Sequence, residues 1–565
     1  HWIVIIGFVV YFNALLGGFV WDDKTYIINN LDVHKVNLFG AFQENLFNNG
    51  GQYRPLPVLY FSVLYSLFNT SPFFYHFIQI SLHIVNAILV FILFKKFFYN
   101  KLAFFLSLIF LVHPLQVESV SYIGATGNNL FFLFGISALL LTIQINNGKR
   151  KLLVLLFGLL LLSLLSKETG GLFLVMVLLY CCIYQRKKLS QYALYSLLTL
   201  TSYFSIRFFI GSVYFERRDL VEIARLGFFE RLLNIPAVIF YYVQNFFYPQ
   251  QLAIGQEWVI THITLQNFYL PLFFEMLFVL LMISFAIYLF KMNKKISYAF
   301  LFFILWLFSG FVLHSQIFPL DWTVSDRWFY FTIVGVLGVI GVFLQRFTTT
   351  NKARVILYFS IATVIISAFS VRTIIRNTNW SDAITLYTHD ANITKSWDLE
   401  NNLGFEYKSI DNQPEALKHY LKAVALFPFE STYLNAGIVY GNMGNQDKAI
   451  EFYYKALSAK HYPTSSHKHN LNTYISLINA LLITHRTIEA KKVTELALHD
   501  YPNTPELWGE LAIIQQWMND DTNAVLSATK ARNLQSTQFT NFIYDKILNK
   551  EKVKIYPGKN EVRFL

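Results

Sequence analysis

Two patterns of apolar and polar residues divide the chain near Trp380. Before that point, long apolar runs alternate with short polar loops, and beyond it apolar residues recur at the spacing of amphipathic helices. The apolar runs lie at 2–20, 73–94, 101–112, 128–145, 152–166, 171–184, 191–210, 268–290, 297–313, 329–345 and 355–371. The pattern predicts an all-α chain: a polytopic membrane helix bundle of about eleven spans, followed by an α-solenoid of repeats.

The second part carries the spacing of tetratricopeptide repeats. With Ala416 at the small-residue position of such a repeat, other residues fall at the expected offsets: Leu403, Gly404, Tyr407, Tyr420, Ala423 and Pro428. Similar sets surround Ala449 and Ala524, and a weaker one surrounds Ala490. We therefore predict a transmembrane domain at 1–376, about four repeats at 377–550 and a tail at 551–565. The concave face of the repeats could bind a peptide, or the repeats could be a spacer or a docking platform for another membrane subunit.

Composition supports the membrane assignment. The chain is 55% hydrophobic, 18% aromatic and 14% charged, which exceeds the apolar content that a soluble core needs. Its charge of +12 does not indicate nucleic acid, because the cations of the first part gather in short clusters between apolar runs. These clusters fall on one side of the predicted topology, which the positive-inside rule makes cytoplasmic: Lys95-Lys96-Lys101, Lys149-Arg150-Lys151, Arg186-Lys187-Lys188, Lys291-Lys294-Lys295 and Arg346-Lys352-Arg354.

Three further details concern one short apolar run, the cysteines and the start of the chain. The run at 232–248 is short, and a full crossing there would move two cationic clusters outside, so we expect it to be re-entrant or interfacial. The two cysteines, Cys181 and Cys182, are adjacent and can build neither a disulfide framework nor a metal site. The chain begins at His1, so residues are expected to precede it, and residues 2–20 lack the small-residue cleavage site of a signal peptide.

The conspicuous polar motifs lie in the loops of the other face. Asp22 and Asp23 follow the first apolar run, where adjacent carboxylates beside an apolar wall can have one pKa raised toward that of a general base. A solvated turn at the membrane interface is the alternative interpretation. Transfer of a sugar from a lipid phosphate needs such a base, together with cations that stabilise the departing phosphate.

Three cations are candidates for that phosphate site. Arg54 could bind phosphate or pair with Asp22 or Asp23, although an interfacial anchor is equally compatible with its position. Lys167 and Glu168 are the only charges between two apolar helices, where Lys167 could bind the lipid phosphate or the pair could simply form a tight turn. Arg327 could hold the phosphate or pair locally with Asp326.

Supporting groups are predicted where one helix ends and the next begins. His113, before Pro114, and Glu118 could be part of the site. Alternatively, the proline ends one helix and a polar side chain caps the next. Asp326 and Glu168 are also predicted to be supporting residues of the site. No Gly-rich phosphate loop, metal-ligand motif or nucleophile elbow is present, so no metal site is predicted and a divalent cation is not indicated.

Taken together, the motifs resemble the integral-membrane type-C glycosyltransferases. The closest resemblance is to the protein O-mannosyltransferase-like group in which transmembrane helices precede tetratricopeptide repeats. It covers nearly the whole chain and rests on six segments: Phe19-Val20-Trp21-Asp22-Asp23, Tyr53-Arg54-Pro55-Leu56, His113-Pro114 with Val117-Glu118-Ser119-Val120, Ser166-Lys167-Glu168, Asp326-Arg327-Trp328-Phe329-Tyr330 and Asn377-Thr378-Asn379-Trp380. Gly127-Asn128 departs from a Gly-Arg that is frequent in the group, and Asp326-Arg327 from a Glu-Arg.

The resemblance implies an inverting glycosyltransferase that takes a mannose-like sugar from a polyprenyl phosphate. By resemblance, Asp22 or Asp23 is the catalytic residue, the acceptor is a hydroxyl of protein Ser or Thr, and the repeats meet the acceptor protein. The short repeat arm suggests a bacterial inner-membrane protein with its site and repeats on the periplasmic side. The alternatives are a non-catalytic membrane scaffold whose repeats bind partner proteins, and a transporter or flippase, for which broken helices near the midplane would be expected.

Overall fold

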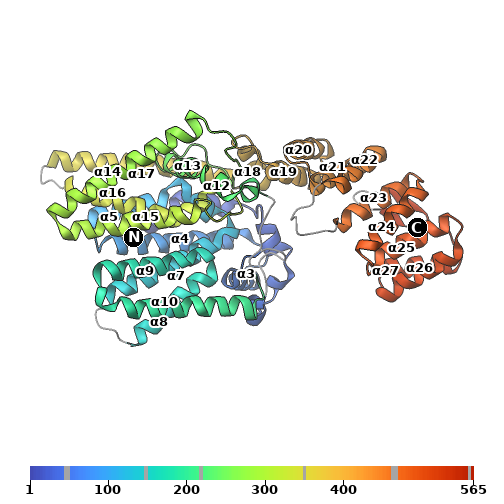
Figure 1. Cartoon of the computed structure of the whole chain (residues 1–565), viewed down its shortest axis with the longest axis horizontal. Coiled ribbons are helices and arrows are strands. Elements are labelled where there is room, and N and C mark those ends of the chain that lie inside the picture. Colours follow the sequence, from blue (N-terminus) through green and yellow to red (C-terminus); the bar gives the residue numbers. More distant parts are fainter. Residues whose placement is uncertain are drawn as a thin grey trace. The chain divides into compact units, whose positions relative to one another are not determined.

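The computed structural model describes residues 1–43, 51–145, 150–214, 221–347, 352–459, 469–557 and 562–564. These residues are almost entirely helical, as the apolar patterns predicted, and they form two compact units. We call His1–Thr394 the membrane unit and Lys395–Leu565 the repeat unit. Figure 1 shows both, coloured along the sequence.

The predicted apolar runs all become helices of the membrane unit. The axes of most of these helices are roughly aligned with one another (Figure 1). The helices are α1 (Trp2–Tyr11), α2 (Leu38–Gln43), α3 (Pro55–Phe68), α4 (Pro72–Phe94), α5 (Asn100–Val112), α6 (Val117–Ser121), α7 (Thr126–Gln144), α8 (Arg150–Ser166), α9 (Gly171–Tyr184), α10 (Leu189–Ser205), α11 (Glu222–Arg225), α12 (Phe228–Leu232), α13 (Ile235–Phe247), α14 (Leu270–Met292), α15 (Lys294–His314), α16 (Phe329–Leu344), α17 (Lys352–Asn379) and α18 (Ala383–Ala391).

Short 3₁₀ and π turns lie between these helices. They are η1 (Phe12–Leu16), η2 (Lys24–Ile28), η3 (Leu31–His34), η4 (Pro114–Gln116), η5 (Ile123–Ala125), η6 (Glu168–Gly170), η7 (Arg186–Lys188), η8 (Ile206–Ile210), η9 (Leu265–Tyr269), η10 (Asp326–Trp328) and η11 (Gln345–Phe347). Several of them carry the polar motifs of the sequence, which places those motifs at the ends of helices.

Seven helices in the described part of the chain are long and apolar enough to cross a membrane. The number becomes eight if α5 and the residues after His113, which meet at 52°, form one bent span. Helices α14 and α17 bury only 6% of their most apolar stretches inside the protein, which suits contact with lipid. The chain is a multi-pass membrane protein, and the count of eleven spans stays a prediction because several apolar helices are shorter than a full crossing.

Small residues let neighbouring spans approach closely. A Cβ on Gly335 would lie 2.6 Å from the backbone nitrogen of Leu307, and one on Gly338 would lie 2.0 Å from the ring of Phe303. Both glycines belong to α16 and both contacts to α15, so the backbone of α16 lies directly against the backbone and a side chain of α15, in the way that membrane helices favour. The run at 232–248 forms α13, which is 13 residues long and too short to cross fully.

The sequence pattern placed the boundary between the two units at residue 376, and the structure places it later in the chain. Helix α17 continues to Asn379, and Arg376 near its end forms two hydrogen bonds, of 2.7 and 3.0 Å, with Asp390 of α18. Asp390 also accepts a 2.8 Å hydrogen bond from the backbone nitrogen of Ile254. Because both charged side chains are buried, this network holds α18 in the membrane unit, which therefore ends at Thr394.

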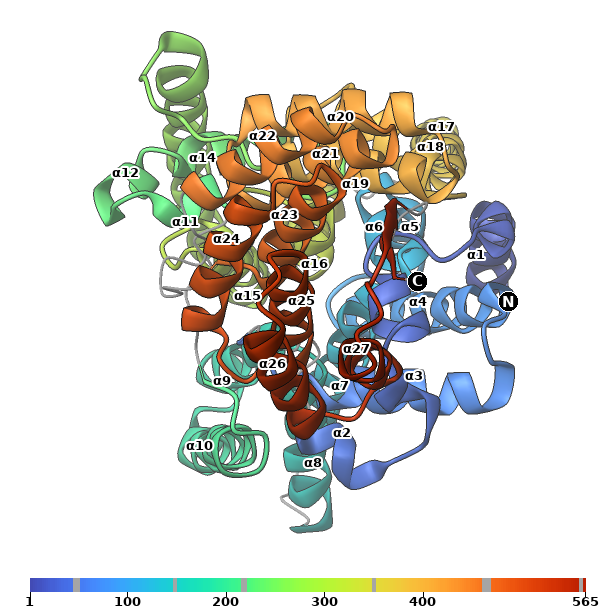
Figure 2. The ribbon, with the colours of Figure 1, turned by 90° about the vertical axis from the view of Figure 1, so that its right-hand side faces the viewer.

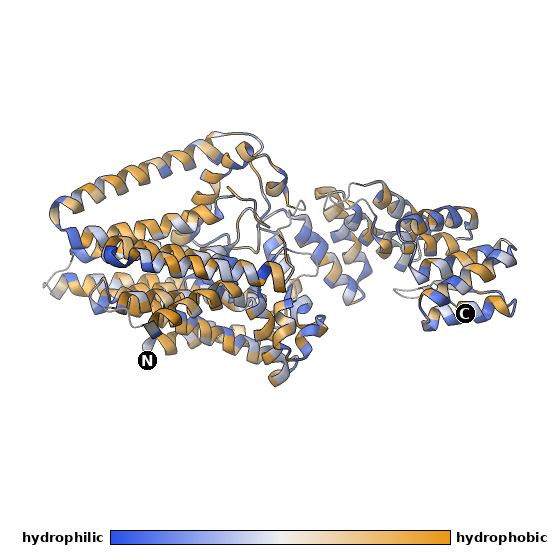
Figure 3. Cartoon of the chain, turned by 60° about the horizontal axis from the view of Figure 1, so that its bottom comes forward, coloured by the Kyte–Doolittle hydropathy of each residue, from blue (hydrophilic) through white to orange (hydrophobic). Residues whose placement is uncertain are grey.

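In its described residues, the repeat unit has four helix pairs and a final helix, and Figure 2 shows successive helices stacked beside one another. Its helices are α19 (Trp397–Ser409), α20 (Gln413–Leu426), α21 (Glu430–Asn442), α22 (Gln446–Ser458), α23 (Leu471–Ile483), α24 (Thr487–Asp500), α25 (Pro505–Trp517), α26 (Asp521–Leu534) and α27 (Gln538–Leu548). The weak repeat around Ala490 forms a helix pair like the others. Figure 3 shows the expected contrast: mostly apolar residues along the helices of the membrane unit, and mixed residues on the repeat helices.

The tail differs from the all-helical expectation. Ile555–Pro557 (β1) and Val562–Phe564 (β2) pair as two short antiparallel strands, with Ile555 opposite Phe564. Residues 558–561 and 565 of the predicted tail lie outside the described residues, as does Lys149 of one cationic cluster.

Two glycines of α21 offer a test of repeat packing. A Cβ on Gly437 would lie 2.6 Å from the ring of Tyr453, whereas the nearest atom to a Cβ on Gly441 is 3.7 Å away. We expect Gly437→Ala to destabilise the repeat unit by about 1–3 kcal/mol through overpacking. Gly441→Ala, the matched control, should be neutral or stabilise the helix by about 0.5–1 kcal/mol. Thermal unfolding of the purified full chain measures both, and equal effects would contradict the packing argument.

Candidate functional site

The two acids of the first loop have different environments. Asp23 is fully buried, and its carboxylate accepts hydrogen bonds from the backbone nitrogens of Val20, at 3.0 Å, and Gly124, at 2.6 Å. Burial raises the pKa of Asp23 well above its usual range, against the two amide donors, which lower it. Asp23 therefore fastens the first loop to the start of α7.

Asp22 is only half-buried and accepts a 3.1 Å hydrogen bond from the hydroxyl of Tyr122. The residue before it, Trp21, has a φ of 54°, a left-handed conformation that is uncommon for a bulky residue and is found most often at functional sites. The ring of Trp21 stacks on Tyr122 at 5.1 Å between centroids. Asp22 is thus held at the edge of an aromatic surface with its carboxylate in partial contact with solvent.

Arg327 pairs with Glu118 of α6 rather than with its neighbour Asp326. The guanidinium forms a close ion pair with Glu118, and the backbone nitrogen of Arg327 donates to the same carboxylate at 2.8 Å. Ser325 donates to both oxygens of Glu118, at 3.0 and 3.1 Å. Asp326 instead accepts a 2.7 Å hydrogen bond from the hydroxyl of Tyr241 in α13. The local ion pair considered from the sequence is therefore not formed.

Arg54 likewise pairs with Glu168 and not with the acids of the first loop. Its Nε lies 3.0 Å from Oε2 of Glu168, and the backbone nitrogen of Tyr53 donates to the other oxygen at 3.1 Å. Arg207, which is completely buried, adds a second guanidinium 3.6 Å from Glu168. Glu168 thus fixes the start of α3 against the turn between α8 and α9.

Lys167 lies among these charges but has a different partner. Among the described residues, the hydrogen-bond acceptor for its ammonium is the side-chain oxygen of Asn128 in α7, an uncharged amide. Burial lowers the pKa of Lys167 well below its usual range, and the nearby cations Arg54 and Arg327 lower it further. Lys167 is therefore a buried cation whose hydrogen-bond partner, within the described residues, is an amide, while Glu168 and Glu118 act on its charge only electrostatically.

The contacts of His113 hold the bend between two helices. Its Nδ1 accepts a hydrogen bond from the backbone nitrogen of Leu115, at 3.2 Å, and its Nε2 lies 2.9 Å from the carbonyl oxygen of Phe246. The ring is fully buried and stacks on Phe246 at 5.0 Å between centroids. These contacts fit the proline-terminator interpretation, in which His113 caps the bend between α5 and α6.

The sequence did not point to several residues that the structure adds to the site. They are Tyr122, Tyr241, Gln52, Asp321 and Trp322. Their partners are far away in the chain, so no local spacing could single them out. The one available signal was the position of Asp321 and Trp322 just before Asp326-Arg327, in the same loop.

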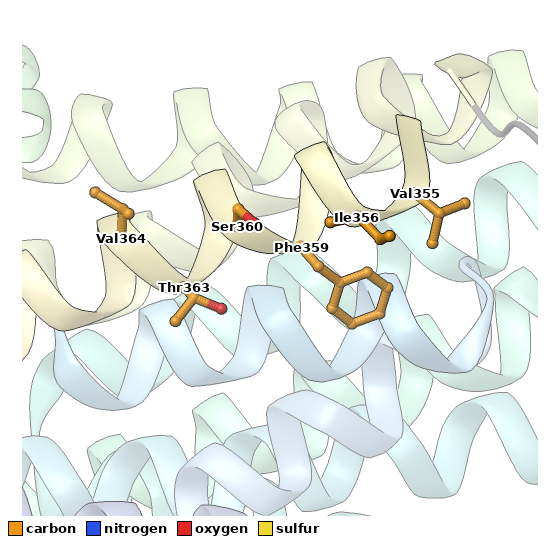
Figure 4. Close-up of a pocket in the computed structure, with 6 residues that line it drawn as sticks. All are labelled: Val355, Ile356, Phe359, Ser360, Thr363 and Val364. Carbon is orange, nitrogen blue, oxygen red and sulfur yellow. The ribbon is translucent and has the colours of Figure 1, made fainter. Parts of the chain in front are cut away.

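These contacts join five segments that the charge pattern assigns to one face: 17–30, 51–54, 113–128, 166–170 and 315–328. They combine a half-exposed carboxylate, three cations and an aromatic surface. In the part of the chain that the structure describes, no three His, Cys, Asp or Glu side chains gather as metal ligands do. An apolar groove along α17, lined by Val355, Phe359 and Val364 among others, contains none of these charged groups (Figure 4).

Comparison with known proteins gives relatives along most of the chain. Human "Protein O-mannosyl-transferase TMTC3" is 25% identical over 537 residues, which are 85% of this chain and 58% of that protein. The mouse protein of the same name is 22% identical over 83% of this chain and 56% of its own length. Human "Protein O-mannosyl-transferase TMTC1" is 35% identical over 141 residues, 23% of this chain and 16% of that protein. The chain thus spans a little over half the length of the relatives that it matches most fully.

The repeat unit has matches of its own. Residues 430–460 match the family model described as tetratricopeptide repeat. A solved structure titled "Crystal structure of YrrB: a TPR protein with an unusual peptide-binding site" is 16% identical and covers 30% of this chain and 93% of that one, with a TM-score of 0.25. The names of the relatives and the repeat match confirm the resemblance that the motifs indicated.

Proposed function

Because the chain resembles protein O-mannosyltransferase-like proteins with transmembrane helices and tetratricopeptide repeats, we propose that it is an inverting glycosyltransferase. Its donor is a polyprenyl phosphate that carries a mannose-like sugar, and its acceptor is a hydroxyl of protein Ser or Thr. The observation that carries the proposal is the half-buried carboxylate of Asp22 at the same face as the buried cation Lys167.

The proposed reaction is a single displacement at the anomeric carbon. Asp22 accepts the proton of the acceptor hydroxyl, and the hydroxyl oxygen attacks C1 of the sugar from the side opposite the phosphate. The bond between C1 and the phosphate oxygen breaks, and its electron pair stays on the polyprenyl phosphate. The added negative charge on the leaving phosphate is then stabilised by cations held in place before the reaction.

The three candidate cations differ in how much charge they can offer. Arg54 and Arg327 each pair with a glutamate, so their net charge toward a ligand is reduced. Lys167 pairs with the neutral amide of Asn128 and keeps its full charge when protonated. We therefore assign the main phosphate contact to Lys167 and supporting contacts to Arg54 and Arg327. Asn128 replaces an arginine that is frequent in the group and here orients Lys167.

The repeats are proposed to bind the acceptor protein or a membrane-complex partner, as tetratricopeptide repeats stack into peptide-binding surfaces. The proposal also places the site and the repeats on the non-cytoplasmic side, which in a bacterial inner membrane is the periplasm. It rests on the position of the cationic clusters between the spans.

The test is transfer of radiolabelled sugar from a panel of polyprenyl-phosphate donors, in membranes that contain the chain. We expect label to move to protein, to withstand lipid extraction and to be released by base-catalysed elimination from Ser or Thr. Membranes without the chain are the control. If no donor is consumed while the repeats still capture membrane proteins, the scaffold interpretation replaces the enzyme.

A further inference from the structure

A second group of polar and aromatic side chains lies beside the charged residues. Gln52, two positions before Arg54, donates a 2.9 Å hydrogen bond from Nε2 to the carboxylate of Asp321. Asp321 also interacts electrostatically with Arg54, so the three side chains are close to one another. Trp322 follows Asp321, and its ring meets the ring of Trp21 edge to face at 6.0 Å between centroids. This group therefore extends the site from the aromatic residue before Asp22 to Arg54.

The loop that carries Asp321 and Trp322 is held rigidly. The side chain of Gln316, which is completely buried, donates to the carbonyl oxygens of Trp322, at 2.7 Å, and Thr323, at 2.9 Å. Its own oxygen accepts from the backbone nitrogen of Leu320 at 3.1 Å. Gln256 adds a backbone bridge to Val324, with a 2.9 Å hydrogen bond. Such support is typical of residues that bind a ligand in a fixed geometry.

One face of Trp322 is covered by backbone. A Cβ on Gly255 would lie 2.2 Å from the indole, so only glycine allows this approach. The side chain is nevertheless half-exposed, and the same holds for Trp21, Asp321 and Gln52. The group thus presents an aromatic surface next to a carboxylate and an amide.

The amide of Gln52 has one atom without a partner. Its Oε1 is buried and, among the described residues, accepts no hydrogen bond. A buried acceptor that stays unpaired destabilises the protein, and a hydrogen-bond donor from a ligand would remove that penalty. The donor cannot be a phosphate diester, which has no hydrogen to give, and the neighbouring carboxylate of Asp321 would repel it.

We propose that Gln52, Asp321 and Trp322 form a subsite for the sugar ring of the lipid-linked donor. Hydroxyl groups of a hexose donate to Gln52 Oε1 and to Asp321, and the apolar C–H face of the ring packs against Trp322. The subsite lies next to Arg54, so a phosphate at the cations places its sugar here. This inference rests on the proposed glycosyltransferase function and specifies how that site recognises the sugar.

Two lipid probes separate the subsite from the phosphate site: polyprenyl-phosphate mannose and bare polyprenyl phosphate. Binding of each to the purified full chain is measured for wild type, Gln52→Ala and Asp321→Asn. Each variant is compared with wild type for the same probe, which removes the difference in charge between the lipids. Gln266→Ala, an exposed glutamine of η9, is the matched control.

We expect both variants to weaken binding of the mannosyl lipid about tenfold relative to binding of the bare lipid, because each loses hydrogen bonds to the sugar hydroxyls. Gln52→Ala changes no charge and should leave binding of the bare lipid unchanged, whereas Asp321→Asn removes a negative charge near Arg54 and should bind the bare lipid at least as tightly as wild type does. The subsite is disproved if both probes weaken equally, if neither changes, or if wild type binds neither. Transfer is measured separately. A wild-type chain that binds the mannosyl lipid through Gln52 but transfers no sugar would overturn the proposed enzyme function and leave the subsite in place.

Discussion

Asp22→Asn is expected to reduce sugar transfer by about 10²–10⁴-fold, because it removes the base that accepts the acceptor's proton. The asparagine keeps the size of the side chain and can still accept the hydrogen bond from Tyr122. The loss should therefore appear in kcat, with the affinity for the donor little changed. Initial rates of label transfer from polyprenyl-phosphate mannose, normalised to folded protein, measure it.

Asp23→Asn is the control for Asp22→Asn, because it makes the same chemical change at the neighbouring residue, which has a structural role. The buried carboxylate of Asp23 accepts two backbone hydrogen bonds with different oxygens, and an asparagine can accept only one of them with its single oxygen. We expect a loss of stability of about 1–3 kcal/mol, seen in thermal unfolding, and a smaller loss of rate than for Asp22→Asn. If Asp23→Asn removes turnover without lowering stability while Asp22→Asn stays active, the two roles are reversed.

The helices and the repeats could be predicted from the sequence, because each depends on the properties of residues that are close together in the chain. A span needs a continuous apolar stretch, which is why the runs from 73–94 to 355–371 reappear as helices. The repeats were visible through small residues such as Gly404 and Gly437, each of which must admit a tyrosine ring of the next helix. The end of α17 was harder to place, because the buried pair of Arg376 and Asp390 joins α18 to the membrane unit.

The ion-pair and hydrogen-bond partners of the charged residues could not be predicted from the sequence. From the sequence, a local pair with Asp326 was one alternative for Arg327, and a tight turn with Glu168 was one alternative for Lys167, yet adjacent residues on a helical turn point in different directions. The structure instead pairs Arg327 with Glu118 and Arg54 with Glu168, across more than a hundred residues in each case. Gln52 and Trp322 were missed for the same reason, since their relevance depends on a loop that comes from elsewhere in the chain.

Lys167→Met is expected to lower kcat/KM by about 10²–10³-fold, the usual cost of removing one preorganised group that stabilises developing negative charge. Methionine fills similar space, so the fold should persist, and Lys167→Arg should keep much of the activity because it keeps the charge. Donor titrations of both variants in membranes give KM and kcat. Equal activity of the Met and Arg variants would show that the charge of Lys167 has no part in transfer.

The lowered pKa of Lys167 predicts a pH dependence of donor binding that a lysine with only a structural role would not give. Its pKa is lowered by burial and by Arg54 and Arg327, and only its protonated form attracts phosphate. Affinity for polyprenyl-phosphate mannose, a diester that does not titrate in this range, should therefore fall as pH rises through the pKa of Lys167, at lower pH than for an ordinary lysine. In Lys167→Arg the guanidinium stays charged, so this fall should disappear. A pH profile shared by both proteins would assign the titration to another group and the phosphate contact to Arg54 or Arg327.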